Sequence, residues 1–146
     1  GFLGHSWVGS WVNMGAGTST SNLKTTYGEV AVSYQGKKIP TGMQFLGCII
    51  GDYTKTAINT SIFTGKIIGV ASYLYGFVTS NVPSFCNYAR TFGKVTEHYL
   101  PAVVRTQRRM FARRNVEQTH LHIKLLEDVY RITRDERMMS LEPFSF

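Results

Sequence analysis

The sequence has few cysteines and lacks long apolar runs. Its 146 residues include only two cysteines, Cys48 and Cys86, which form no CxxC pair. This excludes a disulfide framework and a cysteine-based structural metal site, and it makes a reducing cytoplasm the expected location. Apolar runs are too short to span a bilayer, and the first residues show no basic segment followed by an apolar one. We therefore expect neither a membrane span nor an export signal.

Common catalytic patterns are also missing. His5 is the only histidine before His98, so a zinc site of three imidazoles lacks its ligands and we expect no metal site. The carboxylates suggest no acid and base pair, and neither a Ser-His-Asp pattern nor a P-loop is present. His5 is able to accept a proton, but a lone histidine beside Ser6 and Trp7 fits a surface or packing position better.

Acidic residues are scarce. Lysine and arginine outnumber aspartate and glutamate by 16 to 9, which gives a net charge of +7 and favours anionic partners. Four arginines gather on one side of an expected helix, at positions Arg105, Arg108, Arg109 and Arg113. They form either a surface for phosphate or nucleic acid or a solvated face opposite the apolar stripe. No aromatic stacking pattern is interleaved with them, so we expect the solvated face and no nucleic-acid partner.

The sequence does contain a six-residue repeat. It runs through residues 2–19 and returns in residues 50–73. A large aliphatic residue or Met usually opens each unit and Gly often follows, although Phe2, Thr56 and Lys66 match imperfectly. Three units make a triangular coil with its openers inside, and stacked coils bury them together. The repeat therefore predicts a mainly β protein, a hexapeptide parallel β-helix, in preference to a sandwich with Gly-rich turns.

The pattern divides the chain into four parts. We expect a β-helix over residues 1–84 with an inserted loop at 20–44, a linker at 85–98, a helical hairpin at 99–137 and a loosely ordered tail at 138–146. Alternation followed by turn residues predicts a β-hairpin in the insertion, which is typical of a binding wall. Asn115 is the expected stop of the first helix and Thr119 the N-cap of the second. The helical hairpin should cap the repeat or contact another subunit or domain.

The sharpest local motif covers residues 13–24, at the mouth of the insertion. Its small residues would let a ligand approach the backbone amides, and its polar side chains would contact that ligand. The candidate site residues are Asn13, Gly15, Ala16, Gly17, Thr18, Asn22 and Lys24. Alternatively, the Gly and Ala residues are corners of the repeat and Asn13 only makes a ladder bond. The spacing alone does not decide between these two interpretations.

The start of the sequence bears on its completeness. Gly1 replaces an initiator methionine and the repeat is already in register at Phe2. A β-helix that begins in mid-coil has an open sheet edge, which natural proteins normally cover. We therefore expect this sequence to be the C-terminal part of a longer polypeptide.

Several motifs together resemble one family. Residues 1–18, 21–28, 41–52, 58–60, 82–85 and 110–117 are similar to the C-terminal region of bacterial sugar nucleotidyltransferases. These proteins are related to the bifunctional N-acetylglucosamine-1-phosphate uridyltransferase and glucosamine-1-phosphate acetyltransferase. The resemblance extends to about Arg137. It implies a left-handed β-helix that assembles as a homotrimer and follows a nucleotidyltransferase domain outside this sequence.

The resemblance also implies a function. The parent protein would make UDP-N-acetylglucosamine or a related activated amino sugar from a sugar phosphate or nucleotide sugar, using acetyl-CoA. Mg²⁺ would act only in the missing N-terminal domain. Asn13 matches the asparagine before the family's Gly-Ala-Gly segment, Ala16 the alanine within it, and Asn22 the asparagine shortly after it. In the relatives these residues line the acetyl-sugar and CoA site.

This sequence departs from the family pattern at the positions of the family's catalytic residues. The relatives' general-base histidine aligns two residues before Gly1, and His5 does not occupy its place. Their nearby tyrosine is Phe2, and their lysine beyond the insertion falls at Gln44 or Phe45. Acetyl transfer requires a proton acceptor, because the attacking amine loses a proton. We therefore expect a transferase as parent and an inactive segment here, with its catalytic residues unknown. The alternative is a noncatalytic module for trimerisation and ligand sensing.

Overall fold

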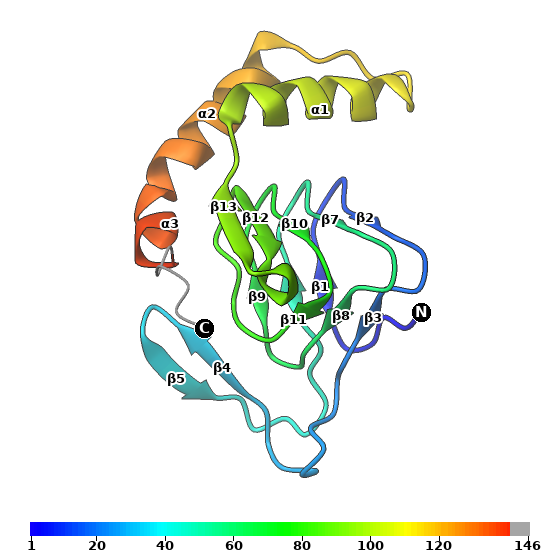
Figure 1. The fold of residues 1–146 in the computed structure, drawn as a ribbon, viewed down its shortest axis with the longest axis vertical. Coiled ribbons are helices and arrows are strands. Elements are labelled where there is room, and N and C mark those ends of the chain that lie inside the picture. The colour runs from blue at the N-terminus through cyan, green and yellow to red at the C-terminus, as the bar shows by residue number, and fades with distance from the viewer. Residues whose placement is uncertain (141–146) are drawn as a thin grey trace.

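Most of the first part of the chain consists of two-residue strands joined by tight turns (Figure 1). The structure is a computed structural model, and it describes residues 1–140. The short strands are β1 (Trp7–Val8), β2 (Asn13–Met14), β3 (Ser19–Thr20), β6 (Ile49–Ile50), β7 (Lys55–Thr56), β8 (Ser61–Ile62), β9 (Ile67–Ile68), β10 (Tyr73–Leu74) and β11 (Phe77–Val78).

These strands enter three sheets in rotation. The first sheet contains β1, β6 and β9, the second includes β2, β7 and β10, and the third contains β3, β8 and β11. All pairs among these strands are parallel, so that Ile49, for example, lies between Trp7 and Ile67. We call β1 to β3 and β6 to β11 together the three-sided stack. The mainly β architecture with parallel strands that the six-residue period predicts is confirmed.

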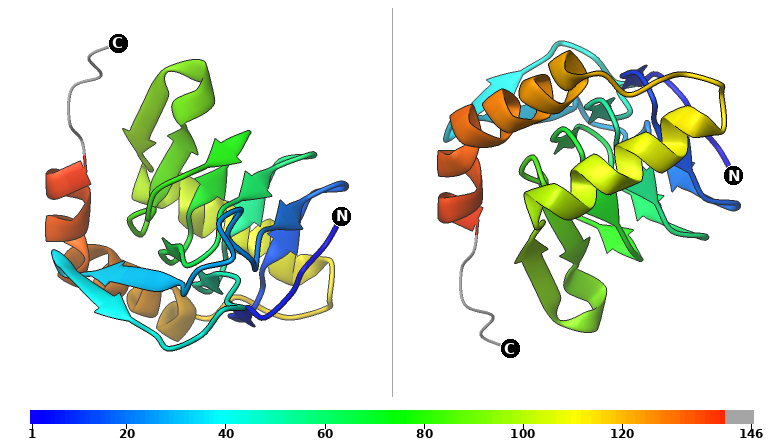
Figure 2. Two further views of the ribbon diagram at one scale, coloured as in Figure 1. Left: turned by 90° about the horizontal axis from the view of Figure 1, so that it is seen from below. Right: turned by 90° about the horizontal axis from the view of Figure 1, so that it is seen from above.

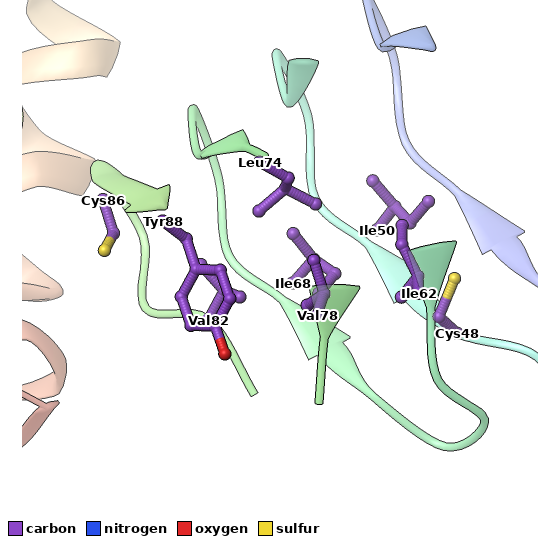
Figure 3. Packing of buried hydrophobic residues seen from close by; sticks show 9 residues of the cluster. All are labelled: Cys48, Ile50, Ile62, Ile68, Leu74, Val78, Val82, Cys86 and Tyr88. Carbon is purple, nitrogen blue, oxygen red and sulfur yellow. The ribbon is translucent and has the colours of Figure 1, made fainter. Parts of the chain in front are cut away.

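The residues that open the repeat units point into the three-sided stack. Ile62 is 1% exposed, and side chains from different sheets meet in one interior (Figure 3). The buried cluster consists of Cys48, Ile50, Ile62, Ile68, Leu74, Val78, Val82, Cys86 and Tyr88. Burying one such aliphatic side chain stabilises the fold by about 1.5–3 kcal/mol. At the N-terminal coil the interior is less dry, since Val8 is 36% exposed and β1 ends its sheet.

The insertion contains the expected hairpin. β4 (Ala31–Tyr34) pairs antiparallel with β5 (Lys37–Pro40). Gln35 and Gly36 connect them with φ angles of 47° and 74°. Two consecutive positive φ values are typical of a type I′ turn, whose twist matches that of the strands. The Asn81 side chain donates to the Ser33 carbonyl over 2.6 Å and ties the hairpin to the three-sided stack.

Residues 85–98, expected to be a linker, are ordered secondary structure. They form β12 (Cys86–Ala89), the 3₁₀-helix η1 (Arg90–Phe92) and β13 (Lys94–Glu97). β12 continues the second sheet parallel to β10, and β13 closes it antiparallel to β12. The physical reason is a two-residue alternation that buries Cys86 and Tyr88 against the interior. The expected linker is therefore the end of the sheet.

Three helices follow among the described residues. They are α1 (Leu100–Ala112), α2 (His120–Ile132) and α3 (Arg134–Ser140), where the pattern predicted two. Thr119 begins α2 with a capping box to His122, as the N-cap motif indicated. α3 begins within the expected helical hairpin, 99–137, and continues into the first residues of the expected tail, 138–140. The rest of that expected tail, residues 141–146, lies outside the described residues.

The helices pack along one side of the three-sided stack. Seen from above, α1 crosses the strands of the second sheet, and α2 returns beside it (Figure 2). Ala71 and Phe85 from the strand region pack with Val103 of α1 and Leu126 of α2. This second apolar cluster fixes the helices to the sheets. None of the helices in residues 1–140 is long and apolar enough to cross a bilayer.

Candidate functional site

The two glycines of the sequence motif form a corner that packs on the next coil. Gly15 N donates to the Thr56 carbonyl over 3.1 Å, and a Cβ at Gly15 would lie 2.6 Å from the Ala57 backbone. Gly17 has a φ of +78°, and a Cβ there would overlap Asn59 Oδ1. Glycine is therefore required at both positions by the close approach of two coils.

The Ala16 carbonyl and the Thr18 hydroxyl also contact the next coil. The Ala16 carbonyl accepts a hydrogen bond from Asn59 N over 2.8 Å. Thr18 is buried, and its hydroxyl lies 2.7 Å from the Thr56 hydroxyl and 3.3 Å from the Ala57 carbonyl. These contacts are those of a corner stacked on the next coil, which was the alternative interpretation of the Gly and Ala residues in this motif. A ligand role for residues 15–18 stays a prediction.

Asn22 lies beside a histidine that was not among the candidate site residues. Asn22 Nδ2 is 2.7 Å from His5 Nδ1, across a sequence separation of 17 residues. The Phe45 ring lies 5.6 Å from the imidazole, centroid to centroid. A hydrogen bond to Nδ1 fixes the ring and determines which nitrogen is free to exchange a proton. The two residues are 17 positions apart, which is close to one coil of three repeat units. This spacing is the signal in the sequence that could have predicted their contact.

Lys24 lines a groove of about 460 Å³. Its ammonium donates to the Glu29 carbonyl over 3.0 Å, and most of the other walls come from Ser and Thr in residues 19–26 and 61–64. This volume lies within the range of small-molecule sites. Although Ser and Thr supply most of these residues, most of the surface that lines the groove is apolar. We call this feature the Lys24 groove.

Asn13 lies apart from the other polar candidates. It is exposed on β2, and its backbone nitrogen donates to the Thr54 carbonyl over 3.0 Å. Its neighbour in the second sheet is Lys55. Within one chain, Asn13 therefore lies on the second sheet, Asn22 beside His5, and Lys24 in its own groove.

A larger groove of about 690 Å³ runs under the hairpin. It lies between the first sheet, the hairpin and α3, and its walls include Trp7, Tyr34, Ile49 and Val82. The insertion does form a wall here, as its place in the repeat suggested. Most of the surface that lines this groove is apolar, as in the Lys24 groove.

Three buried titratable groups, His98, Cys86 and Cys48, are held in their neutral forms. Burial lowers the pKa of His98 to about 4 and raises the pKa of the Cys86 thiol to about 12. Burial also raises the pKa of the Cys48 thiol, against a hydrogen bond from Ser6. These groups therefore carry no charge near neutral pH. In residues 1–140, no three His, Cys, Asp or Glu side chains gather as metal ligands.

No protein-family model matches the chain. It is 39% identical over 74 residues to a bifunctional sugar-1-phosphate nucleotidylyltransferase/acetyltransferase of Sulfurisphaera tokodaii, which is 51% of this chain and 18% of that protein. It is 34% identical over 73 residues to the bifunctional protein GlmU of Methanococcus vannielii, which is 50% of this chain and 17% of the relative. GlmU of Methanococcus maripaludis is 37% identical over 73 residues, again 50% of this chain and 18% of the relative.

The matched segment is short compared with these relatives. It spans less than a fifth of their length, although it takes in half of this chain. Half of this chain is therefore GlmU-like, similar to one segment of the bifunctional sugar-1-phosphate nucleotidyltransferase/acetyltransferases.

Proposed function

We propose that this chain is the acetyltransferase-type, left-handed parallel β-helix of a longer sugar nucleotidyltransferase that acts in the cytoplasm. The observation that carries the proposal is the match of half the chain to proteins named as nucleotidyltransferase and acetyltransferase in one polypeptide. The rotation of the strands through three parallel sheets supports the β-helix. The product is UDP-N-acetylglucosamine or a related activated amino sugar.

The reaction proposed for this part is acetyl transfer from acetyl-CoA to a sugar amine. The amine nitrogen forms a bond to the acetyl carbon, the carbon–sulfur bond breaks, and CoA leaves as its thiol. The amine must also lose a proton to a base. We assign that base to His5, whose imidazole is exposed, in place of the histidine that the resemblance puts upstream of Gly1. Asn22 lies 2.7 Å from Nδ1, and with its amide turned so that the oxygen accepts from Nδ1–H, Nε2 is left free to take the proton.

The Lys24 groove is the proposed anion subsite. Its ammonium and hydroxyl groups suit the phosphate of a sugar phosphate or of CoA, which supplies the acetyl group when bound. Asn13 and the corner at residues 15–18 lie on the same terminal coils as His5. These residues keep their proposed role next to the substrate, in a site completed by a second copy.

A homotrimer is part of the proposal. Large apolar side chains are exposed on the coil that carries His5 and on the neighbouring insertion, namely Phe2, Leu3, Trp7 and Phe45. Exposed apolar groups in this number are typical of an interface. A threefold assembly would cover them and bring His5 of one copy close to the next copy.

The test uses the full-length protein. It is incubated with glucosamine 1-phosphate, UTP, acetyl-CoA and Mg²⁺, and pyrophosphate and free CoA are measured. We expect both products, and His5→Gln should lose at least about 100-fold in CoA release while pyrophosphate release is kept. His120→Gln, which changes an exposed histidine of α2, is the matched control. The absence of both products would contradict the proposed function, whereas unchanged CoA release in His5→Gln would contradict only the role of His5.

The second candidate is a noncatalytic module for trimerisation and ligand sensing. The observation that favours it is the corner at Gly15 and Gly17, which is closed by the next coil. This candidate predicts a trimer in light scattering and no heat when acetyl-CoA is titrated into the protein. A clear binding heat would rule it out.

A further inference from the structure

The helix α2 carries an exposed apolar stripe. Leu121, Leu125 and Ile132 are 66%, 54% and 74% exposed. Leu125 and Ile132 follow Leu121 by four and eleven residues, which places all three on one side of a helix with 3.6 residues per turn. The side of α2 that faces the three-sided stack carries Leu126, which is buried. Three large aliphatic side chains in one row on the outer side are typical of an interaction surface.

Arginines without carboxylate partners lie on α1 and in the turn that follows it. The exposed arginines of this row are Arg105, Arg108, Arg109, Arg113 and Arg114. Each ion pair in residues 1–140 involves Lys124, Arg131 or Arg137, so none includes an arginine of this row. A guanidinium donates two parallel hydrogen bonds to a phosphate group, which an ammonium cannot do. The row therefore suits a surface that presents phosphate groups.

The stripe and the arginine row lie on the outer side of one helical layer. Val103 of α1 and Leu126 of α2 pack in the same cluster against the three-sided stack, so the other sides of both helices face away from it. Of the elements in residues 1–140, none lies over these two helices (Figure 1, Figure 2). Residues 99–133 contain seven Lys or Arg and three Asp or Glu. The outer side thus combines positive charge with exposed apolar side chains.

The carboxylate on the same side of α2 as the stripe is already paired with two cations. Asp128 follows Leu121 by seven residues, and its oxygens lie 3.1 Å from Lys124 Nζ and 2.9 Å from Arg131 Nη2. Two positive charges therefore offset one negative charge beside the stripe. The apolar side chains are bordered by net positive charge on α2 as well as on α1.

This combination distinguishes between possible occupants. A second copy of the chain would bring like charges together around the apolar stripe, which opposes association. A nucleic acid would pair with the arginines but would leave the leucines in water. An anionic lipid bilayer satisfies both features, because its headgroup phosphates accept from arginine and the boundary of headgroups and acyl chains takes up apolar side chains.

We propose that the outer side of α1 and α2 binds the surface of an anionic lipid bilayer. The arginine row pairs with headgroup phosphates, while Leu121, Leu125 and Ile132 enter the boundary between headgroups and acyl chains. The cytoplasmic leaflet is the anionic one, which agrees with the location proposed above. The surface shares no residue with His5, Asn22 or the Lys24 groove, so it is independent of the acetyl-transfer proposal.

Flotation with lipid vesicles provides the direct test. The full-length protein is mixed with vesicles of equal parts phosphatidylglycerol and phosphatidylcholine, and vesicles of phosphatidylcholine alone are the neutral reference. We expect binding to the anionic vesicles and at least about tenfold weaker binding to the neutral ones. Binding to the anionic vesicles should also weaken as NaCl is raised, because salt screens the arginine contacts. Equal binding to both vesicles, or binding to neither, would overturn the proposal.

A double charge variant tests the arginine row. Arg105→Gln with Arg109→Gln removes two charges and should weaken binding to the anionic vesicles about 30-fold, at about fivefold per charge. Lys37→Gln with Lys38→Gln removes two charges from the exposed strand β5 and is the matched control. It should change binding by less than about twofold, because charges beyond a Debye length from the lipid are screened. Equal losses in the two variants would show attraction by overall charge and would overturn the assigned surface.

A double apolar variant tests the stripe. Leu121→Ser with Leu125→Ser should weaken vesicle binding about tenfold or more. Phe92→Ser, at a side chain of η1 that is 68% exposed, is the control and should keep binding. Circular dichroism checks that each variant is folded.

Two further outcomes would assign the surface to another occupant. Binding of the protein to duplex DNA but not to anionic vesicles would overturn the proposal in favour of a nucleic acid. A smaller assembly in light scattering for Leu121→Ser with Leu125→Ser than for the unchanged protein would mean that a second copy covers the stripe, and it would also overturn the proposal.

Discussion

Arg137 Nε donates to Glu97 Oε1 over 2.6 Å and joins α3 to β13. The Arg137 side chain is 2% exposed, and its remaining nitrogens donate to the Tyr130 carbonyl over 2.7 Å and the Thr133 hydroxyl over 2.9 Å. The Tyr130 hydroxyl donates to the same Glu97 oxygen over 2.7 Å. One buried guanidinium therefore holds together the end of the sheet and the last two helices.

Arg137→Lys should destabilise the protein by about 3 kcal/mol, because an ammonium cannot make the same set of planar contacts and would leave buried acceptors unpaired. Urea unfolding followed by circular dichroism measures the change. Arg134→Lys is the matched control at an exposed position of α3 and should change stability by less than about 0.5 kcal/mol. Equal stability of the two variants would show that the network contributes little.

His98 should make stability depend on pH. Its Nε2 is buried without a partner, and burial lowers its pKa to about 4, below the value of about 6.5 for an unfolded histidine. As pH falls below about 6.5, the unfolded chain binds a proton that the folded chain does not, so the free energy of unfolding falls until about pH 4. Urea unfolding at pH 7.5 and pH 5 measures this loss.

In His98→Gln the loss between pH 7.5 and pH 5 should become smaller. His120→Gln, at an exposed histidine of α2, should leave it as in the unchanged protein. An identical pH dependence in His98→Gln and the unchanged protein would contradict the assigned cause.

Gly17→Ala and Gly36→Ala form a matched pair. Both glycines have positive φ, at 78° and 74°, but only Gly17 faces the next coil, and a Cβ at Gly36 meets nothing within 4 Å. Gly36→Ala should therefore cost about 1 kcal/mol from backbone strain alone. Gly17→Ala should cost about 3 kcal/mol or more, because the coils must move apart. Similar unfolding free energies for the two variants would contradict the coil contact.

Shortening an apolar side chain in the three-sided stack should lower the free energy of unfolding more when that side chain is more deeply buried. Ile62→Ala removes a fully buried side chain and should cost about 3–4 kcal/mol. Val8→Ala, in the terminal coil, should cost about 1 kcal/mol, because that side chain is already partly exposed. Thermal and urea unfolding of both variants test the gradient. A larger loss in Val8→Ala would mean that the terminal coil is covered in solution.

The six-residue period of the sequence predicted the parallel strands of the three-sided stack, because openers such as Ile50 and Ile62 point into one interior. β12 and β13 were missed, since their alternation starts at an aromatic and cysteine-containing segment where the six-residue period has ended. The sequence predicted α1 and α2 because their apolar residues recur at helical spacing. Val103 and Leu126 belong to these apolar faces, and both are buried in the second cluster.

For the site, sequence reasoning found Asn22 and Lys24 but not their surroundings. Pairing Asn22 with His5 required the coil register, and the 460 Å³ groove at Lys24 arises from loops that come together only in the fold. Gln107 shows the limit most clearly. Its helical position predicts burial, but its hydrogen bond with Gln118, which lies beyond the end of α1, forms only in the fold.

The two ends of the three-sided stack differ in what they offer to another polypeptide. At one end, β1 and β2 are the terminal strands of their sheets. At the other end, β13 runs in the opposite direction and carries Lys94 and Glu97, and charges at an edge discourage pairing. β13 closes the second sheet in this way, whereas β9 and β11 end the first and third sheets. The reversed, charged strand therefore protects one of the three sides against the addition of a strand from another polypeptide.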